Sequence, residues 1–134
     1  MEQVKILVDT SAYSAFLSGN SDIKEIIQNA DEIVLNPVVL AELLSGFSLG
    51  TKEKRNREIL DDFLSSERVH ILDIDFETSE RYAVILKYLY SKGTPIPTND
   101  IWIASSAMQY GLKVITLDNH YSKIPQILAQ IVRS

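Results

Sequence analysis

The sequence predicts a single α/β domain with a central parallel sheet flanked by helices on both faces. Short apolar runs rich in Val and Ile alternate along the chain with amphipathic, helix-like segments, which is the pattern of repeated β-α-β units. Several of these runs are continuously apolar, as expected of strands that are covered on both sides. The 134 residues contain no repeat, no low-complexity tract and no linker, so one domain over residues 1–134 is expected.

Four strands are expected from the apolar runs. Their ranges are 4–9, 31–36, 68–74 and 112–118. Pro37 ends the second strand because proline cannot continue a strand ladder. The last residues, 122–134, predict a mixed tail without a definite element.

Helices are expected between these strands, where apolar residues recur at helical spacing. Their ranges are 10–19, 21–30, 37–50, 51–66, 75–93 and 98–111. Ser21 or Asp22 is expected to cap the second helix, and Asp100 or Asn99 to cap the last. Gly46 marks a point where the third helix could break.

The composition excludes several classes of protein. The absence of cysteine excludes a disulfide framework, a thiol nucleophile and cysteine-ligated zinc. No run approaches the roughly 20 apolar residues of a membrane span, and the first apolar run is too short for a signal peptide. A soluble, cytoplasmic protein with no membrane partner is therefore expected. The formal net charge of −5 disfavours nucleic acid unless some of the acids bind divalent cations.

Acidic residues stand at the ends of several expected elements. Asp9 ends the first strand and Asp118 ends the fourth. Asp100 begins the helix that leads into the fourth strand. These three acids are expected to converge, because open α/β sheets build their sites outside the carboxyl ends of the strands. Glu42 lies among apolar residues of the third helix, where a carboxylate is costly unless it is exposed, protonated or bound to a cation.

Each acid also has a purely structural interpretation. Asp9 and Asp100 suit helix caps, and Asp118 suits a turn. Glu42 could simply face solvent. If the acids converge, however, carboxylates about 5 Å apart repel by about 3 kcal/mol per pair at an effective dielectric constant near 20, which favours a bound cation. Oxygen ligands without cysteine or paired histidines select Mg²⁺ or Mn²⁺ rather than zinc, and such ions promote phosphodiester hydrolysis.

Four stretches carry a resemblance to a known family. They are, in this order, "ILVDTSAY", "VVLAELLSG", "KGTPIPTNDIWIASSAMQYG" and "VITLDNHY". With these motifs the chain resembles the PIN-domain ribonucleases, and most closely the VapC toxins of prokaryotic toxin–antitoxin pairs. The resemblance extends from residue 4 to about residue 121, and the third and fourth stretches are its specific parts.

The resemblance implies a PIN-like fold and a role for each acid. Asp9 and Asp100 would be the core Mg²⁺ ligands, with Mn²⁺ as the alternative ion. Glu42 and Asp118 would complete the catalytic set or act through water. Further polar residues match supporting positions of the family and would hydrogen-bond the carboxylates: Thr10, Ser11, Asn99 and Thr116. The implied activity is endonucleolytic hydrolysis of RNA, leaving a 5′-phosphate and a 3′-hydroxyl.

Binding of RNA would also require basic side chains that contact phosphates and aromatic rings that stack on bases. Four basic residues after the Glu42 helix could guide phosphates, or could form an ordinary solvated helix face: Lys52, Lys54, Arg55 and Arg57. Tyr13, Trp102 and Tyr121 could stack on bases, although core packing is the more usual role of such residues. His70 is expected in the core or at its rim. His120 is expected to be structural or exposed, with a contact to substrate as the alternative.

The resemblance further implies a small cognate antitoxin and commonly a homodimer. The apolar faces of residues 12–19 and 42–50 are the expected docking region. A housekeeping RNA-processing nuclease is the main alternative to a toxin. A receiver-like signalling module would need a lysine where Asp118 stands, and a non-catalytic binding module would normally have lost one of the acids.

Overall fold

Five parallel strands form the centre of the protein, which is described for residues 3–133 by a computed structural model. The strands are β1 (Lys5–Val8), β2 (Glu32–Leu35), β3 (Val69–Ile71), β4 (Lys113–Thr116) and β5 (Leu128–Ile131). They lie in the order β3-β2-β1-β4-β5, and each neighbouring pair is parallel. The predicted α/β class is therefore confirmed, whereas the extent of the domain over residues 1–134 stays a prediction.

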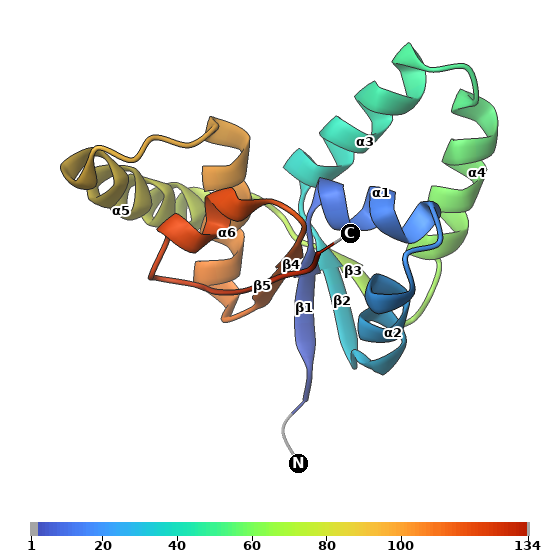
Figure 1. Ribbon diagram of the computed structural model, residues 1–134, viewed down its shortest axis with the longest axis horizontal. Helices are drawn as coiled ribbons and strands as arrows, with labels where there is room; N and C mark the ends of the chain where they lie inside the picture. The colour runs from blue at the N-terminus through green and yellow to red at the C-terminus, as the bar shows by residue number, and fades with distance from the viewer. Residues whose placement is uncertain (1–2, 134) are drawn as a thin grey trace.

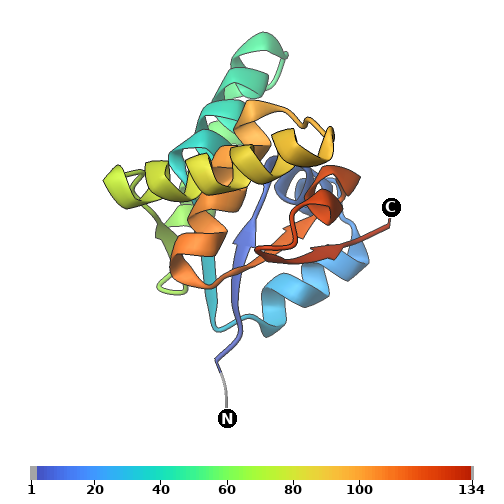
Figure 2. The same cartoon turned by 90° about the vertical axis from the view of Figure 1, so that its left-hand side faces the viewer.

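Helices connect the strands and cover both faces of the sheet. Within residues 3–133 they are α1 (Thr10–Leu17), α2 (Ser21–Asn29), α3 (Pro37–Leu49), α4 (Glu53–Leu64), α5 (Phe76–Lys92), α6 (Thr98–Tyr110) and the 3-10 helix η1 (Asn119–Lys123). Helices α1 and α2 lie on one side of the sheet, and α5 and α6 lie on the other (Figures 1 and 2). Helices α3 and α4 form a hairpin that extends beyond the ends of the strands, at the upper right of Figure 1. None of the helices in the described part of the chain is both long and apolar enough to cross a membrane.

The central strands β1 and β4 are fixed by uninterrupted apolar residues. Ile6, Leu7 and Val8 are fully buried, as are Val114 and Ile115. Burying such a side chain contributes about 1.5–3 kcal/mol, so a shift of either strand would cost much of the stability of the domain. The residues that directly follow β1 and β4 are consequently held in fixed positions.

The chain connections change direction between β1 and β4. From β1 the chain passes to β2 and then to β3 at one edge, and it crosses back to β4 on the other side of β1. The strand register places Val8 opposite Ile115, and the backbone N–H of Asp9 donates to the carbonyl of Ile115 at 3.2 Å. Binding sites in open α/β sheets form outside the carboxyl ends of the strands at such a reversal. The ends of β1 and β4 therefore meet the topological requirement for a site.

Strand β5 corrects the prediction of a mixed tail for residues 122–134. Its first three residues are exposed, so it lacks the apolar run by which a strand is recognised in sequence. Backbone pairing with β4 forms it instead, with Leu128 opposite Lys113 and Ile131 opposite Thr116. An edge strand of this kind is decided by its neighbour rather than by its own residues.

The starts and ends of two helices also differ from the prediction. Asn20, and not Ser21 or Asp22, caps α2 by accepting a hydrogen bond from a backbone N–H at 3.0 Å. Gly19 precedes it with φ of 86°, which places the cap one residue earlier than expected. Helix α3 runs through Gly46 without a break, because its apolar face packs against the rest of the core.

Candidate active site

Four acids lie at the carboxyl ends of β1 and β4, where hydrogen bonds of neighbouring side chains hold them and one of them contacts the buried hydroxyl of Tyr121. The Tyr121 side chain is 1% exposed, and burial raises its pKa; the charges of Asp9, Asp100, Asp118 and Glu42 raise that pKa further. Asp100 contacts this hydroxyl directly, with its Oδ1 3.4 Å from the Tyr121 oxygen. The structure thus brings together acids from the ends of two strands and from two helices.

Asp9 is the most deeply held of these acids. Its side chain is 4% exposed and caps α1, where Oδ1 accepts from the backbone N–H of Ala12 at 2.8 Å. The hydroxyl of Ser11 donates to the same oxygen at 2.8 Å, and the hydroxyl of Thr116 donates to Oδ2 at 2.6 Å. The cap expected at Asp9 is therefore confirmed, and it does not prevent a role of this carboxylate in a site, which stays a prediction.

Thr116 and Ser11 connect Asp9 to the end of β4. The Thr116 hydroxyl is fully buried and accepts from the backbone N–H of Asp118 at 2.9 Å. The Ser11 hydroxyl accepts from the backbone N–H of Leu117 at 3.0 Å. These bonds join α1 to the segment after β4, so Asp9 and Asp118 keep a constant spacing.

Glu42 faces the site from the second turn of α3 and is half-buried. The hydroxyl of Thr10 donates to its Oε1 at 2.6 Å, and the Asn99 side-chain amide donates to its Oε2 at 3.4 Å. The alternative in which Glu42 merely points to solvent is wrong. All four polar residues expected to support the acids hydrogen-bond one of them.

Asp100 does not cap its helix, contrary to one of the predictions. Helix α6 begins at Thr98 after Pro97, so Asp100 lies inside the first turn, and no side chain caps this helix end. Asn99, the other expected cap, is bonded to Glu42 instead. The carboxylate of Asp100 is consequently available to the site, next to the positive end of the helix dipole.

His120 joins Asp100 to Asp118. Its Nδ1 lies 2.8 Å from Asp100 Oδ2 and 3.0 Å from Asp118 Oδ1. Asp118 caps η1 through its Oδ1, which accepts from the backbone N–H of His120 at 2.8 Å. The hydroxyl of Tyr121 donates to Asp100 Oδ1 at 3.4 Å. These contacts and its partly exposed side chain are compatible with the structural or exposed role expected for His120, and its contact with substrate stays a prediction.

Burial and mutual repulsion oppose ionisation of the central acids. Burial raises the pKa of Asp9 despite its hydrogen bonds, and the charge of Asp100 adds to this. Burial also raises the pKa of Asp100; the hydrogen bond to His120 opposes the change, while the charges of Asp118 and Glu42 reinforce it. Within residues 3–133 no lysine or arginine forms an ion pair with any of these acids. The site therefore carries negative charge that no fixed cation of the described chain balances.

A divalent metal ion fits this donor set. One ligand atom each from Asp100, Asp118 and His120 lie within 4.8 Å of one another. Carboxylate oxygens are the preferred ligands of hard divalent ions. Asp9 is outside this trio, and each of its oxygens already accepts a hydrogen bond. The acidic cluster is thus suited to a cation, and the identity of the ion is a separate question.

Asn36 is a positioning residue that the sequence did not indicate. It is fully buried at the end of β2, where its Oδ1 caps α3 by accepting from the backbone N–H of Val39 at 3.1 Å. Its amide group donates to the Ser106 hydroxyl at 3.0 Å and to the Trp102 carbonyl at 3.4 Å. Asn36 therefore fixes α3, which carries Glu42, against α6. The signal available in sequence, an Asn before Pro37, indicates only the cap.

The aromatic residues proposed to stack on bases have mostly structural roles. Tyr13 is fully buried, packs edge-to-face on Phe63 with ring centroids 5.2 Å apart, and has its pKa raised to about 12 by burial. Tyr121 is buried as well, so stacking on RNA is wrong for both tyrosines. Trp102 is half-buried against Tyr82, with ring centroids 4.4 Å apart. His70 is exposed on β3, at the edge of the sheet.

The basic segment is exposed at the tip of the α3–α4 hairpin (Figure 1). Its members all point to solvent and form no salt bridge with other described residues: Lys52, Lys54, Arg55 and Arg57. Their packing does not decide whether these residues guide RNA phosphates or simply form a solvent-exposed helix face. Their contact with RNA stays a prediction.

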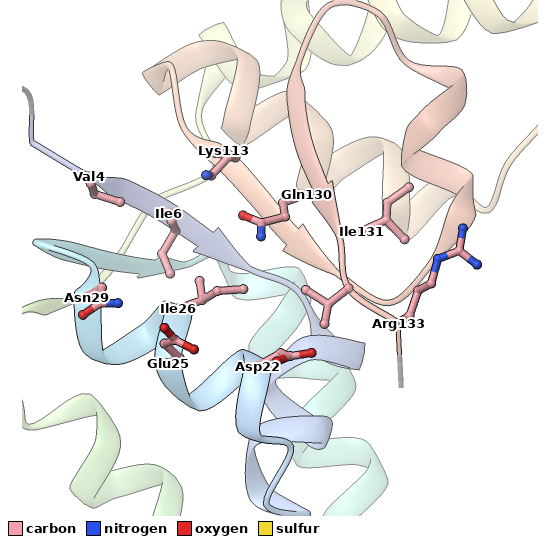
Figure 3. A pocket seen from close by; sticks show the side chains of 11 residues that line it. Val4, Ile6, Asp22, Glu25, Ile26, Asn29, Lys113, Gln130, Ile131 and Arg133 are labelled. Atoms are coloured by element: carbon pink, nitrogen blue, oxygen red, sulfur yellow. The ribbon is translucent and has the colours of Figure 1, made fainter.

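A cavity of about 510 Å³ lies between α2 and β5 (Figure 3). Asp22 and Glu25 line it from α2, while Lys113 and Arg133 line it from the sheet side. No acid of the candidate site is among its lining residues in the described chain. Charges of both signs line this cavity, so it lacks the unbalanced negative charge that would favour a cation. The acid cluster is accordingly the better candidate for an active site.

Sheet order and acid cluster together define an α/β domain whose site lies at the topological reversal and is suited to a metal ion. The chain belongs to the PIN-domain family, because the family model for the PIN domain matches residues 6–127. It is 31% identical to Ribonuclease VapC2 of Rickettsia felis over 79% of this chain and 78% of that protein. It is also 30% identical to Ribonuclease VapC of Rickettsia bellii, over 91% of this chain and 92% of the relative.

A solved structure shows the same fold. The crystal structure of VapBC2 from Rickettsia felis bound to a DNA fragment from their promoter superposes with a TM-score of 0.85 at 26% identity, covering 96% of this chain and 99% of that chain. The resemblance to PIN-domain proteins of the VapC type is therefore confirmed, as is the PIN-like fold. A receiver-like module is excluded by the same result.

Proposed function

We propose that this chain is a divalent-metal-dependent endoribonuclease and the toxin of a VapBC toxin–antitoxin pair. The observation that carries the proposal is the network that connects four acids at the ends of β1 and β4, in a chain whose relatives are ribonucleases of the VapC type. Thr116 connects Asp9 to Asp118, and His120 connects Asp118 to Asp100. Glu42 is bonded by the chain neighbours of Asp9 and Asp100, which are Thr10 and Asn99. Those relatives favour a toxin over a housekeeping RNA-processing enzyme. All four acids are present, which favours a catalytic domain over a binding module.

Mg²⁺ is the proposed ion, with Mn²⁺ as the alternative. Asp9 and Asp100 would hold it, and Glu42 and Asp118 would complete the set. When bound, the ion would lower the pKa of a water molecule and neutralise charge on the phosphodiester group. Burial, and to a lesser extent the neighbouring carboxylates, raise the pKa of Asp9 and Asp100. A bound cation would stabilise the charged forms of both acids, which supports this assignment.

The polar neighbours of the acids would orient them toward the ion. Oδ1 of Asp9 accepts two hydrogen bonds, from Ser11 and from the backbone N–H of Ala12, whereas Oδ2 accepts one from Thr116 and keeps a lone pair in a fixed direction. Thr10 and Asn99 hold Glu42 in the same way. Four carboxylates that are fixed before the substrate arrives need little reorganisation during the reaction.

A small antitoxin is the proposed protein partner, and a homodimer is the proposed assembly in the cytoplasm. A groove of about 230 Å³ lies between α1, α2 and α4, lined in part by Phe16, Ile27 and Phe63. Of residues 12–19, which were expected to dock the antitoxin, Phe16 lines this groove. In the second expected docking region, residues 42–50, Leu49 at the end of α3 is 89% exposed and would offer an apolar contact of its own.

Cleavage of a defined RNA panel tests the proposed activity. The wild-type chain should cut RNA with Mg²⁺ and stop when EDTA is added. Asp100→Asn should lower the rate by roughly a hundredfold or more, because it removes a ligand charge without changing side-chain volume. Asp75→Asn is the matched control, since this aspartate lies on the exposed start of α5. Cleavage that survives EDTA, or that persists in Asp100→Asn, would refute the proposal.

A further inference from the structure

The imidazole of His120 occupies a place that hydrogen bonding alone explains poorly. Its Nδ1 is within 3.0 Å of two carboxylate oxygens at once, one from Asp100 and one from Asp118. A ring nitrogen carries at most one hydrogen, so it can make a well-aligned hydrogen bond to only one of them. The other contact is then poorly aligned as a hydrogen bond, and a cation shared by the three atoms would account for both short distances.

Three donor atoms at this spacing resemble neighbouring ligands of one ion. Ligands in adjacent positions around a six-coordinate Mg²⁺ or Mn²⁺ ion are separated by about 3 Å, as follows from metal–ligand distances of about 2.1 Å. The distances from Nδ1 to Asp100 Oδ2 and Asp118 Oδ1 are 2.8 and 3.0 Å. A neutral imidazole presents a lone pair, and a cation between the three atoms would accept all three.

Local structure holds the His120 ring in this place. Asp118 caps η1 and accepts the backbone N–H of His120, which fixes the first turn of that helix. The next residue, Tyr121, is buried in the core beneath the site. The His120 side chain is 39% exposed, so its position is set by these backbone contacts and by the carboxylates rather than by burial.

We infer that His120 is a nitrogen ligand of the active-site metal ion and that it biases the site toward Mn²⁺-like transition metals over Mg²⁺. Imidazole is a good ligand for first-row transition metals, whereas Mg²⁺ prefers oxygen donors. This inference rests on the proposed function and makes its metal site more specific. The site would bind the ion through one imidazole nitrogen as well as carboxylate oxygens. The inference also makes His120 the second ligand, beside Asp118, from the segment after β4.

Electron spin echo measurements on the Mn²⁺-loaded full chain test the inference. A directly bound imidazole nitrogen couples to the electron spin of Mn²⁺ and modulates the echo. We expect this modulation in the wild type and its loss in His120→Gln, a variant that keeps a polar side chain of similar reach. The chain has two histidines, so His70→Gln on the exposed edge strand is a matched control that should retain the signal.

Calorimetric titration gives a second, independent measurement. His120→Gln should weaken Mn²⁺ binding by roughly tenfold or more, as loss of a ligand costs at least as much as loss of an outer partner. The same substitution should weaken Mg²⁺ binding by a smaller factor. The ratio of Mn²⁺ affinity to Mg²⁺ affinity should therefore be lower in His120→Gln than in the wild type. Equal losses for both ions, or a nitrogen signal that persists in His120→Gln, would overturn the inference.

The outcomes also separate this inference from the proposed function. If Mn²⁺ binds, if binding is lost in Asp100→Asn and if no nitrogen modulation is seen, His120 is only a hydrogen-bond partner and the nuclease proposal stands. If neither ion binds at a site that depends on Asp100, both proposals fail. Thermal unfolding of His120→Gln without metal shows whether the variant is folded.

Discussion

Two aspartates of this protein have nearly the same hydrogen bonds and opposite pKa shifts. Asp9 caps α1 and accepts from a backbone N–H and from two hydroxyl groups. Asp75 caps α5 and accepts from the backbone N–H and the hydroxyl of Thr78, and from the amide of Gln109. Yet the pKa of Asp9 is raised, whereas these hydrogen bonds lower the pKa of Asp75.

The surroundings of the two carboxylates explain the difference. Asp9 is 4% exposed and faces the charge of Asp100, while Asp75 is exposed to solvent. Removing a carboxylate from water disfavours its charged form, and three hydrogen bonds do not fully compensate at Asp9. Hydrogen bonds therefore show that a carboxylate is held in place. Burial beside other carboxylates is what distinguishes a candidate metal ligand from a helix cap.

The largest difference between the two aspartates is expected in how their variants respond to a metal ion. An ion at 100 times its dissociation constant stabilises a folded protein by about 2.7 kcal/mol, so Mn²⁺ or Mg²⁺ should raise the melting temperature of the wild type. The rise should persist in Asp75→Asn and disappear in Asp9→Asn. Thermal unfolding with and without the ion measures this. An equal rise in both variants would mean that Asp9 is only a cap.

Without metal, the free energy of unfolding should respond to pH in opposite ways at the two positions. The folded-state pKa of Asp9 lies above the ordinary value of 3.8, so its ionisation costs stability as pH rises through that folded-state pKa. Asp9→Asn should therefore be more stable than wild type near pH 7, and this advantage should shrink as pH falls toward 4.

Asp75→Asn should show the reverse behaviour. The folded-state pKa of Asp75 is lowered, so its contribution to stability is present above the ordinary pKa of 3.8 and is lost as pH falls through the lowered value. The variant should be less stable than wild type at pH 7 and approach it in acid. Urea unfolding of both variants from pH 3 to 7 provides the measurement. Parallel pH curves for the two variants would contradict the distinction between site and cap.

In contrast to the buried Asp9, the basic residues Lys52, Lys54, Arg55 and Arg57 are exposed and form no salt bridge with other described residues. Arg55→Ala should lower the slope of log affinity against log salt concentration by about 0.7 for single-stranded RNA, the value for one phosphate contact. Its effect on metal-dependent melting should be nil, because the side chain is exposed at the tip of the α3–α4 hairpin. Filter binding at several salt concentrations measures the slope. An unchanged slope would assign Arg55 to a solvated helix face.

Much of the fold followed from local patterns in the sequence. The runs ending at Val8 and Thr116 identified the two central strands because burial on both faces demands continuous apolar residues. The prediction failed where a neighbouring strand, rather than the segment's own residues, determines the secondary structure. The edge strand β5 has an exposed sequence and forms only by pairing with β4.

The sequence predicted the acids of the candidate site but not all of the residues that contact or position them. Asp9, Asp100 and Asp118 stood out because each is a charge beside an apolar element. Asn36 gave no such signal, since its bond to Ser106 crosses 70 residues of chain. His120 was visible as a residue type, but its contact with Asp100 depends on how η1 folds back against α6.

By itself the sequence determined the parallel α/β class, the family and the identity of the acids, because apolar runs and motif spacing are local properties of a chain. Only the tertiary structure decided which oxygens meet, which donors hold them and how far burial opposes their charge. The hydroxyl of Thr116 reaches Asp9 across 107 residues because β1 and β4 pair in one register. Contacts of this kind arise from packing, which no short stretch of sequence contains.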